Sequence, residues 1–375
     1  MDYVKSTNCG YCHGKKREAQ SWALESISKK MEGKGYSNNC SLSNGIVDEM
    51  SLKEYEDQIK DGWRRSGTYM YKPDLLRSCC RQYTIRTNYD MFVNNGHFTH
   101  NTRKTLRKFY NKFNNPSCGN SKSLLETYLT RDRGDDFYTV LLPNTFSMDK
   151  YELYKKYQIH VHNDEEDDVN EEGFWRFLCD DPFKEDVGPI DWLSINREWS
   201  SISLDNYKDD DKFENLKKLR GPIHECYIIN GELAAISVLD ILPDGISSVY
   251  FIWDPKHANL GLGTISALRE IVMTQILNKS YYYLGFFIPD CSKMVYKGKY
   301  GGEIRNFTKM KTPKWVSLET AMKCESFKEG RFAVFDNEGK DVAEDMYGVD
   351  IKDNDKSLVI VNKPCLFPKP RVVPC

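Results

Sequence analysis

Residues 225–288 carry the pattern that most constrains the fold of this chain. Three apolar stretches in this run predict strands, Glu225–Ile229, Leu233–Leu242 and Ile246–Trp253. Asn230-Gly231 joins the first two as a tight hairpin turn, and a second turn follows at 243–245. Three strands in succession joined by turns indicate an antiparallel sheet, and such a sheet must bury one face against other elements.

A glycine-rich loop follows the third strand and opens a helix. Gly261 and Gly263 precede a helix expected over Thr264–Lys279, and Tyr281–Ile288 predicts the next strand. Backbone N–H groups at such a helix start bind anions, although a plain helix entry is the alternative. The order of elements resembles the GNAT N-acetyltransferase fold. That fold usually has Arg or Gln three residues before the first glycine, where this chain has Ala258, and the difference argues against acetyl-CoA as donor.

Two cysteine pairs in the N-terminal third predict a metal site. Cys9 and Cys12 form a Cys-x-x-Cys turn, which directs two thiolates at one ion, and Cys79-Cys80 supplies further ligands. Zinc and an iron–sulfur cluster both suit thiolates. A histidine is the alternative to one cysteine, from among His13, His97 and His100. Free thiols are the other alternative, but a loop-rich N-terminal region favours a metal that staples it. Residues 14–50, between the pairs, are expected to form a long mobile insertion.

The N-terminal residues lack the apolar stretch of a secretory signal, and the longest apolar run, 281–289, is too short to span a bilayer. We therefore expect a cytoplasmic or nuclear protein without membrane contact. In a reducing compartment, 12 cysteines are expected to be free, catalytic or metal-bound.

The formal net charge of −2 hides a segregated distribution. Residues 63–125 hold 12 basic and 2 acidic residues, 162–186 hold 2 basic and 11 acidic residues, and 279–314 hold 8 basic and 2 acidic residues. Two basic stretches with interleaved aromatic residues are typical of a nucleic-acid surface, whereas solvated helix faces that pair with the acidic stretch are the alternative.

The basic helix expected over Thr102–Phe113 carries the residues that we assign to nucleic acid, which are Arg103, Lys104, Arg107 and Lys108. A different candidate, Asp254, stands at the end of the third strand of the 225–288 run. Its carboxylate is placed to orient an attacking amine or to accept its proton, and a cap of the turn at Pro255 is the alternative.

Several longer strings resemble the eukaryotic arginyl-tRNA–protein transferase family. They lie in order from residue 9 to about 300 and include Cys9-Gly-Tyr-Cys12, Gly62-Trp-Arg-Arg-Ser-Gly67, Tyr71-Lys-Pro73, the segment 79–86, the segment 154–164, Tyr250-Phe-Ile-Trp-Asp-Pro255, the segment 262–270 and Lys293-Met-Val-Tyr-Lys-Gly298. The resemblance implies transfer of arginine from Arg-tRNA to the N-terminal α-amine of proteins that begin with Asp, Glu or oxidised Cys. It implies that Cys9, Cys12, Cys79 and Cys80 hold zinc or an iron–sulfur cluster, and that these products are degraded through an N-degron ubiquitin ligase.

The resemblance also suggests a substrate site. An aminoacyl-tRNA ester is already activated, so neither ATP nor acetyl-CoA is expected. An acidic acceptor side chain calls for a cationic pocket. The residues expected at the substrate site are Arg64, Arg65, Lys293, Tyr296, Lys297, Gly261 and Gly263.

The expected architecture is α+β, with a GNAT-like domain of mostly antiparallel sheet and flanking helices plus a smaller Cys-rich, metal-stapled N-terminal domain. The expected divisions are 1–130 for the metal-binding and basic domain, 131–360 for the catalytic domain and 361–375 for a Pro-rich tail. Two other functions remain as alternatives: an N-acetyltransferase that uses acetyl-CoA, and a non-catalytic module that binds tRNA or degrons.

Overall fold

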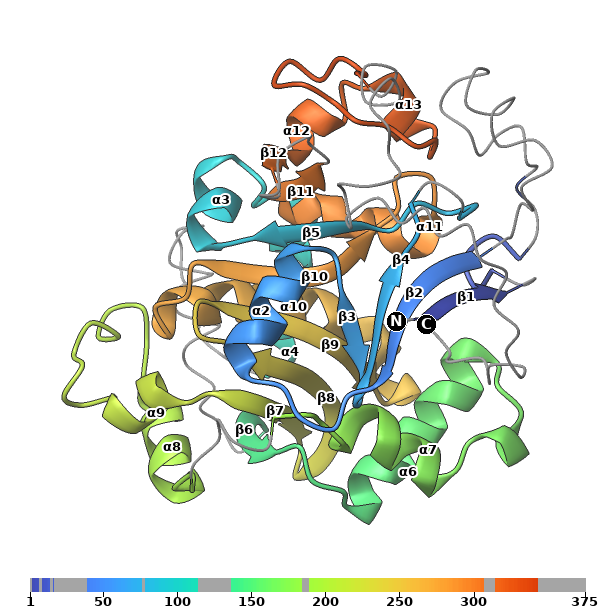
Figure 1. The fold of residues 1–375 in the computed structure, drawn as a ribbon. Helices are drawn as coiled ribbons and strands as arrows, with labels where there is room; N and C mark the ends of the chain where they lie inside the picture. Colours follow the sequence, from blue (N-terminus) through green and yellow to red (C-terminus); the bar gives the residue numbers. More distant parts are fainter. Residues whose placement is uncertain are drawn as a thin grey trace.

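The computed structural model of this chain describes residues 2–6, 9–13, 16, 39–75, 78–113, 136–183, 189–306 and 314–342. Two sheets and their flanking helices make up the fold (Figure 1), which confirms the α+β class. The expected Pro-rich tail at 361–375 lies outside the described residues. No helix in the described ranges is long and apolar enough to cross a membrane.

The larger sheet has eight strands in the order β12-β11-β5-β10-β9-β8-β7-β6. Its only parallel pair is β9 with β10 among the described strands, and the other neighbours run antiparallel. The strands are β5 (Tyr83–Thr87), β6 (Phe137–Pro143), β7 (Gly221–Ile229), β8 (Glu232–Ile241), β9 (Gly245–Trp253), β10 (Tyr281–Phe287), β11 (Glu303–Asn306) and β12 (Lys314–Ser317). The three expected strands of the 225–288 run are therefore β7, β8 and β9.

Helix α10 (Leu262–Ile276) joins β9 to β10, because parallel neighbours need a crossover connection. The pairing of these two strands is short. It runs from Tyr281 opposite Gly245 to Tyr283 opposite Ser247 and continues no further. The later halves of β9 and β10 are therefore not hydrogen-bonded to each other. Beyond Tyr283, the pairing of β10 with β5 also shifts register.

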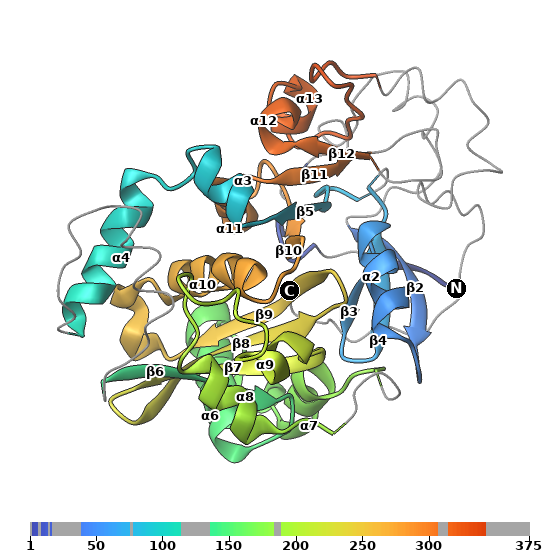
Figure 2. The ribbon, with the colours of Figure 1, turned by 90° about the vertical axis from the view of Figure 1, so that its left-hand side faces the viewer.

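Helices and the smaller sheet cover the two faces of the larger sheet. Figures 1 and 2 show α10 on one face and α2 (Leu52–Lys60) with the smaller sheet on the other. Side chains of β9 alternate between these faces. Phe251 packs in the core with α10, whereas Tyr250 and Ile252 pack with helices α6 (Met148–Tyr157) and α7 (Glu171–Phe174).

The smaller sheet has the order β1-β2-β4-β3. Its strands are β1 (Asp2–Ser6), β2 (Asn39–Ile46), β3 (Arg64–Ser66) and β4 (Tyr69–Pro73). Strand β2 corrects the expectation of a mobile insertion over 14–50, because residues 39–46 pair with both β1 and β4. After β4 the chain enters the larger sheet at β5, well before the expected boundary at residue 130.

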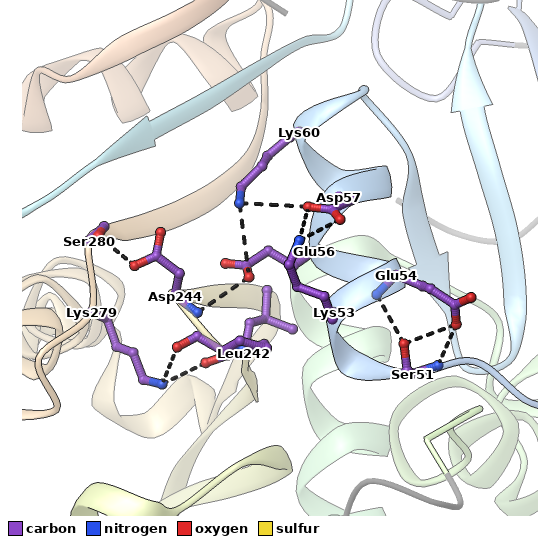
Figure 3. A network of polar contacts seen from close by, with 11 residues as sticks. Ser51, Lys53, Glu54, Glu56, Asp57, Lys60, Leu242, Asp244, Lys279 and Ser280 are labelled. Carbon is purple, nitrogen blue, oxygen red and sulfur yellow. Dashed lines mark hydrogen bonds and ion pairs between the residues drawn. The ribbon is translucent and has the colours of Figure 1, made fainter. Parts of the chain in front are cut away.

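Helix α2 (Leu52–Lys60) docks the smaller sheet onto the larger one. The string Ser51-Leu-Lys-Glu54 predicts a capping box at its start, and the structure confirms it, because Ser51 and Glu54 bond reciprocally. Figure 3 shows the next contact, where Glu56 accepts a hydrogen bond of 3.3 Å from the backbone of Asp244. Beside it, the Lys279 ammonium donates to the carbonyl of Leu242 at 2.6 Å. The turns at the base of β9 and β10 are thereby held against α2.

The remaining helical elements frame the sheets. They are α3 (Tyr89–Asn94), α4 (His100–Lys112), α6 (Met148–Tyr157), α7 (Glu171–Phe174), α8 (Trp192–Trp199), α9 (Glu214–Lys218), α11 (Ser292–Val295), α12 (Leu318–Ala321), α13 (Glu325–Lys328) and the 3₁₀ turns η3 (Glu166–Asp168), η5 (Pro255–Leu260) and η6 (Tyr296–Tyr300). Two π-helical turns extend α6 and α7, which are η2 (Gln158–His162) and η4 (Trp175–Cys179). Such turns are rare and occur most often at functional sites.

Candidate functional site

The four predicted cysteine ligands converge. The sulfur atoms of Cys9, Cys12, Cys79 and Cys80 all lie within 4.8 Å of one another, and the Cys12 and Cys79 sulfurs are 3.5 Å apart. Tetrahedral ligands at the Zn–S distance of about 2.3 Å stand about 3.8 Å from each other, so the spacing fits a bound metal. No histidine joins these four in the part of the chain that the structure describes.

The ionisation of these thiols also favours binding of a metal ion between them. Hydrogen bonds from Cys79 and Cys80 lower the pKa of Cys9 to about 2. The pKa of Cys80 is raised by its hydrogen bonds to Cys79 and Cys9 and by burial. The buried thiols therefore compete for one negative charge, and a metal ion would supply the positive charge that lets all four ionise.

The cysteine cluster supports the end of β10. Its buried members pack with Ile288 and Cys291, which immediately precede α11. Lys16 links the same region, because its ammonium donates to the carbonyl of Cys79 at 3.1 Å and pairs with Asp290 at 2.5 Å. A metal at this cluster would thus fix the segment that carries Lys293.

The separated ends of β9 and β10 are the second part of the site. On β9, the Tyr250 hydroxyl lies 3.0 Å from Nε2 of His162 and donates to Gln158 at 3.2 Å. Both partners belong to the π-helical turn η2, and Phe177 of η4 packs on Tyr250 with ring centroids 5.0 Å apart. The two π-helical turns therefore hold one aromatic side chain of β9 in place.

His162 faces charges of both signs. Burial lowers its pKa, the nearby Lys293 lowers it further, and Asp164 acts in the opposite direction. The imidazole is therefore neutral at neutral pH, with one ring nitrogen free of a proton. The sequence motif 154–164 contains His162, but nothing in the sequence indicates that it pairs with Tyr250, because that pairing depends on the π-helical turn.

Helix α11 and turn η6 carry the next group of expected substrate residues. Lys293 and Tyr296 are exposed, and Tyr296 is 49% accessible to solvent. Lys297 is half-buried, and its ammonium donates to the carbonyl of Phe286 at 2.9 Å. Lys293 and Tyr296 are thus open to a ligand, whereas Lys297 holds the end of β10.

Gly261 and Gly263 lie at the start of α10 as expected. Gly261 has a φ of 68°, and a Cβ there would come within 2.8 Å of Thr105 on α4. Only glycine combines this backbone conformation with so close an approach. The basic helix α4 therefore lies directly against the glycine loop.

The four basic residues of α4 divide into two groups. Lys104, Arg107 and Lys108 are exposed. Arg103 is half-buried, and its guanidinium stands 5.1 Å from the ring centroid of Phe98. Buried Leu106 and Phe109 anchor the helix to the core, so the three exposed cations face solvent.

Arg64 and Arg65 are buried, unlike the residues of α11. Arg65 forms a two-point ion pair with Asp240, with nitrogen–oxygen distances of 2.8 and 2.6 Å. Arg64 donates to the carbonyls of Trp63 at 2.7 Å and Gly285 at 3.1 Å. Both guanidinium groups therefore join the two sheets.

Asp254 caps the turn η5. Its carboxylate accepts from the backbone N–H of Lys256 at 2.9 Å, and its other oxygen lies 3.9 Å from Lys156 and 3.7 Å from the Lys256 ammonium. The capping role is present, and the expected role toward an amine stays a prediction.

A cationic cavity that sequence reasoning missed lies between the two sheets. It is lined by Gly62, Lys72, Pro73, Leu75, Gln82, Thr84 and Arg305. Lys72 falls in the string Tyr71-Lys-Pro73. The sequence does not show that it lies near Arg305, because that proximity depends on how the two sheets meet.

Comparison with known proteins matches both parts of the chain. Residues 7–98 match the family model described as arginine-tRNA-protein transferase, N terminus, and residues 149–305 match the model for its C terminus. The first model contains all four cysteines, and the second contains β9, α10 and α11.

Individual relatives agree with the family models. The chain is similar to arginyl-tRNA–protein transferase 1 of Saccharomyces cerevisiae, with 36% identity over 93% of this chain and 68% of the yeast protein. The protein of the same name in Drosophila melanogaster is 36% identical over 52% of this chain and 34% of its own length. Aspartate/glutamate leucyltransferase of Chromobacterium violaceum is 27% identical over 66% of this chain and 74% of its own length.

Proposed function

This chain belongs to the arginyl-tRNA–protein transferase family and is an aminoacyltransferase, and from that premise we propose its acceptors and the roles of its residues. The acceptors are proteins that begin with Asp, Glu or oxidised Cys. The arginylated N-terminus is then bound by an N-degron ubiquitin ligase. The observation that carries this proposal is the match of both family models, together with the convergence of all four cysteines.

The reaction needs little chemical activation. The acceptor α-amine attacks the ester carbonyl that joins arginine to the terminal ribose of tRNA. An amide bond forms and the ester C–O bond breaks. The tRNA leaves with the ribose oxygen, and the proton that the amine loses ends on that oxygen. The ester is already activated, so neither ATP nor acetyl-CoA takes part. A free α-amine has a pKa of about 8, so a part of it is neutral at physiological pH. Positioning of the two reactants then supplies most of the acceleration.

The separated ends of β9 and β10 are the place for this encounter. Such a separation resembles the donor cleft of the GNAT fold, which we propose for this domain. Lys293 and Tyr296 border it from the side of α11, and both are exposed. The glycine loop at the start of α10 and the basic helix α4 lie side by side, which suits the phosphates at the acceptor end of a tRNA.

Asp254 is proposed to orient the acceptor amine. Its side chain is 9% exposed, and the residue directly follows β9. Asp254→Asn separates this role from capping, because Asn caps a helical turn as well as Asp does. We expect the variant to fold normally and to transfer arginine more slowly at saturating substrates. Full transfer by the variant would show that Asp254 only caps the turn and does not act on the amine.

A single metal ion is proposed for the cysteine cluster. Ligands of one ion at about 2.3 Å stand no more than about 4.6 Å apart, close to the 4.8 Å that encloses the four sulfurs. An iron–sulfur cluster distributes its thiolates over several irons and spreads them further. The ion, zinc in this proposal, would be held by Cys9, Cys12, Cys79 and Cys80 and would act structurally. Metal and sulfide analysis of anaerobically purified protein distinguishes zinc alone from iron with sulfide.

The transfer itself is tested with labelled Arg-tRNA and a peptide that begins with Asp. Incorporation of label without ATP or any other protein supports the proposal. Uptake from labelled acetyl-CoA instead would identify an acetyltransferase. Binding of Arg-tRNA without any incorporation would identify a non-catalytic module.

A further inference from the structure

A chain of hydrogen bonds runs through the π-helical turn η2 and ends at His162. The Gln158 amide donates to the carboxylate of Asp164 at 3.2 Å. The Tyr250 hydroxyl donates to the side-chain oxygen of Gln158 at 3.2 Å, and Nε2 of His162 lies 3.0 Å from the same hydroxyl. Each link is within ordinary hydrogen-bond distance, so the four side chains form one continuous chain.

The direction of this chain follows from which atoms can donate. A carboxylate only accepts, so Gln158 turns its NH₂ group toward Asp164 and its oxygen toward Tyr250. That oxygen takes the single hydroxyl proton of Tyr250. The hydroxyl oxygen is then left to accept from Nε2 of His162. The neutral imidazole therefore carries its proton on Nε2, and Nδ1 keeps a free electron pair.

The Nδ1 atom of His162 is open to a ligand. It has no hydrogen-bond partner among the residues that the structure describes, and the side chain is only half-buried. Two aromatic rings fix the plane of the imidazole. Tyr157 packs edge-on at 5.2 Å between ring centroids, and Tyr250 stacks at 6.5 Å. The free electron pair of Nδ1 thus points in a fixed direction.

His162 lies beside the separated ends of β9 and β10. Its partner Tyr250 stands on β9 beyond Ser247, where the pairing with β10 ends. Lys293 of α11 is close enough to lower the pKa of His162. Burial raises the pKa of Tyr157 to about 12, and the nearby Tyr296 of η6 adds to this shift. Turn η2 therefore faces α11 and η6 at the place that we propose for the encounter of the two substrates.

We propose that Nδ1 of His162 is the base that accepts the proton of the attacking α-amine. The inference rests on the proposed function, and it adds a role distinct from the orientation proposed for Asp254. As the bond between the amine nitrogen and the ester carbonyl carbon forms, one N–H proton passes to Nδ1. The imidazolium gives this proton to the ribose oxygen as the ester C–O bond breaks. The imidazole is then neutral again, and no other reactant is needed.

The charges around the ring keep the base ready at neutral pH. Burial lowers the pKa of His162 from its ordinary value of about 6.5, and Lys293 lowers it further, while Asp164 acts in the opposite direction. Tyr157 and Tyr250 contact the ring as phenols without charge. The base is therefore available at neutral pH and is lost when the imidazole gains a proton in acid.

His162→Gln is the first test, because the Gln amide can donate to Tyr250 as the imidazole does but offers no base. We expect normal thermal stability and normal affinity for Arg-tRNA. The single-turnover rate of transfer to a peptide that begins with Asp should fall about 100-fold or more. His160→Gln is the matched control in the same turn. His160 is exposed, and its Nδ1 lies 2.9 Å from the carbonyl of Lys156.

The pH profile separates a base from a structural residue. At low peptide concentration, the neutral fraction of the amine gives log rate a slope of about 1 against pH below its pKa of about 8. In the unaltered chain, the slope should steepen to about 2 below the pKa of His162. His162→Gln should keep a slope of about 1 throughout, whereas His160→Gln should follow the unaltered chain.

The tautomer gives a readout that does not depend on activity. In ¹⁵N NMR of chain labelled at histidine, the two Gln variants identify the signals of His162 and His160. We expect the neutral His162 ring to carry its proton on Nε2 and the neutral His160 ring to carry it on Nδ1, since the Lys156 carbonyl can only accept. Tyr250→Phe should mix the tautomers of His162 and slow the transfer.

The outcomes distinguish this proposal from the proposed function. Absence of arginine transfer by the unaltered chain would overturn the proposed function itself. Where the unaltered chain transfers arginine, equal rates in His162→Gln and His160→Gln would overturn the role of His162 as base. A slower rate with the slope of about 2 retained in His162→Gln would overturn it too, because another group would then titrate. If His162→Gln does not fold, a proton on Nδ1 of His162 in the unaltered chain overturns the proposal, and a proton on Nε2 supports it.

Discussion

Glu270 on α10 is a carboxyl group buried among hydroxyls. It accepts hydrogen bonds from Ser237, from Ser266 at 2.5 Å and from Tyr282. Burial raises the pKa of Glu270 to about 7, although the hydrogen bonds from the three hydroxyls act in the opposite direction. The group is therefore protonated in the folded chain over a pH range where an unfolded chain has lost the proton.

This difference makes stability depend on pH. Between the unfolded pKa of about 4.3 and the folded value near 7, the native state holds the extra proton, so the free energy of unfolding falls as pH rises. Glu270→Gln removes this contribution. The free energy of unfolding of both proteins is measured by urea denaturation at pH 5 and at pH 7.5. From pH 5 to pH 7.5, the value for the variant should rise by about 2 kcal/mol relative to the value for the unaltered chain. Parallel pH profiles for the two proteins would contradict the assignment.

Single residues also show where sequence reasoning stops. The four cysteines were predicted as one site, because their chemistry and spacing are specific. Arg64 and Arg65 look in the sequence like free cations, yet their partners Gly285 and Asp240 come from the other sheet. A buried ion pair of this kind depends on tertiary packing, and the local sequence gives no sign of it.

Strand β3 is attached to β8 by such a pair. The side chains of Arg65 and Asp240 are 2% and 0% exposed. Arg65→Met should destabilise the chain by about 3–5 kcal/mol, because it leaves a buried carboxylate without a partner. Arg65→Met combined with Asp240→Leu should recover most of that loss in denaturant unfolding. A single variant with unchanged stability would show that the pair does not hold the sheets together.

Helix α4 is the element that we assign to tRNA. Neutralising Lys104, Arg107 and Lys108 together to Gln should weaken Arg-tRNA binding. Each lost phosphate contact lowers the slope of log K against log salt by about 0.7–0.9, so the slope should fall by about 2–3. Binding is measured over a series of salt concentrations.

A matched triple variant controls for net charge. Lys208, Lys212 and Lys218 are exposed lysines around α9, on a different part of the surface. Their change to Gln should leave the slope close to that of the unaltered chain. Equal slopes for both triple variants would remove α4 from the tRNA interface.

The sequence predicts which segments form helices and strands better than it predicts irregularities within them, such as π-helical turns. The capping box at Ser51 and the run from β7 to β10 follow local rules of sequence and are confirmed. The π-helical turns and strand β2 were not foreseen. A π-helical turn inserts one residue without a sequence signature, and it persists here because His162 and Gln158 bond to Tyr250 on another element.

At the scale of the whole molecule, the cysteine cluster connects distant parts of the chain. Its residues come from the first turn after β1 and from the segment before β5, and they pack against the start of α11. Removal of the metal by a chelator should increase hydrogen exchange across 288–296 and abolish transfer. Cys324→Ala, a buried cysteine outside the cluster, should leave both unchanged. Unaltered exchange after verified metal loss would contradict a structural role.

The net charge of −2 shows how little a whole-chain sum says about partners. Exposed cations are concentrated on α4 beside the glycine loop, and buried cations are concentrated where the sheets meet. The exposed cations of α4 form a basic surface that suits a polyanion.

We propose above all that this chain joins arginine from Arg-tRNA to an acidic N-terminus. The most direct measurement is the mass of an amidated peptide that begins with Asp, after incubation with the chain and Arg-tRNA alone. We predict one added arginine residue, located by fragmentation at the α-amine, and no addition to the same peptide with an acetylated N-terminus. An unchanged mass, or arginine on the acetylated peptide, would show that the chain does not transfer arginine to the α-amine.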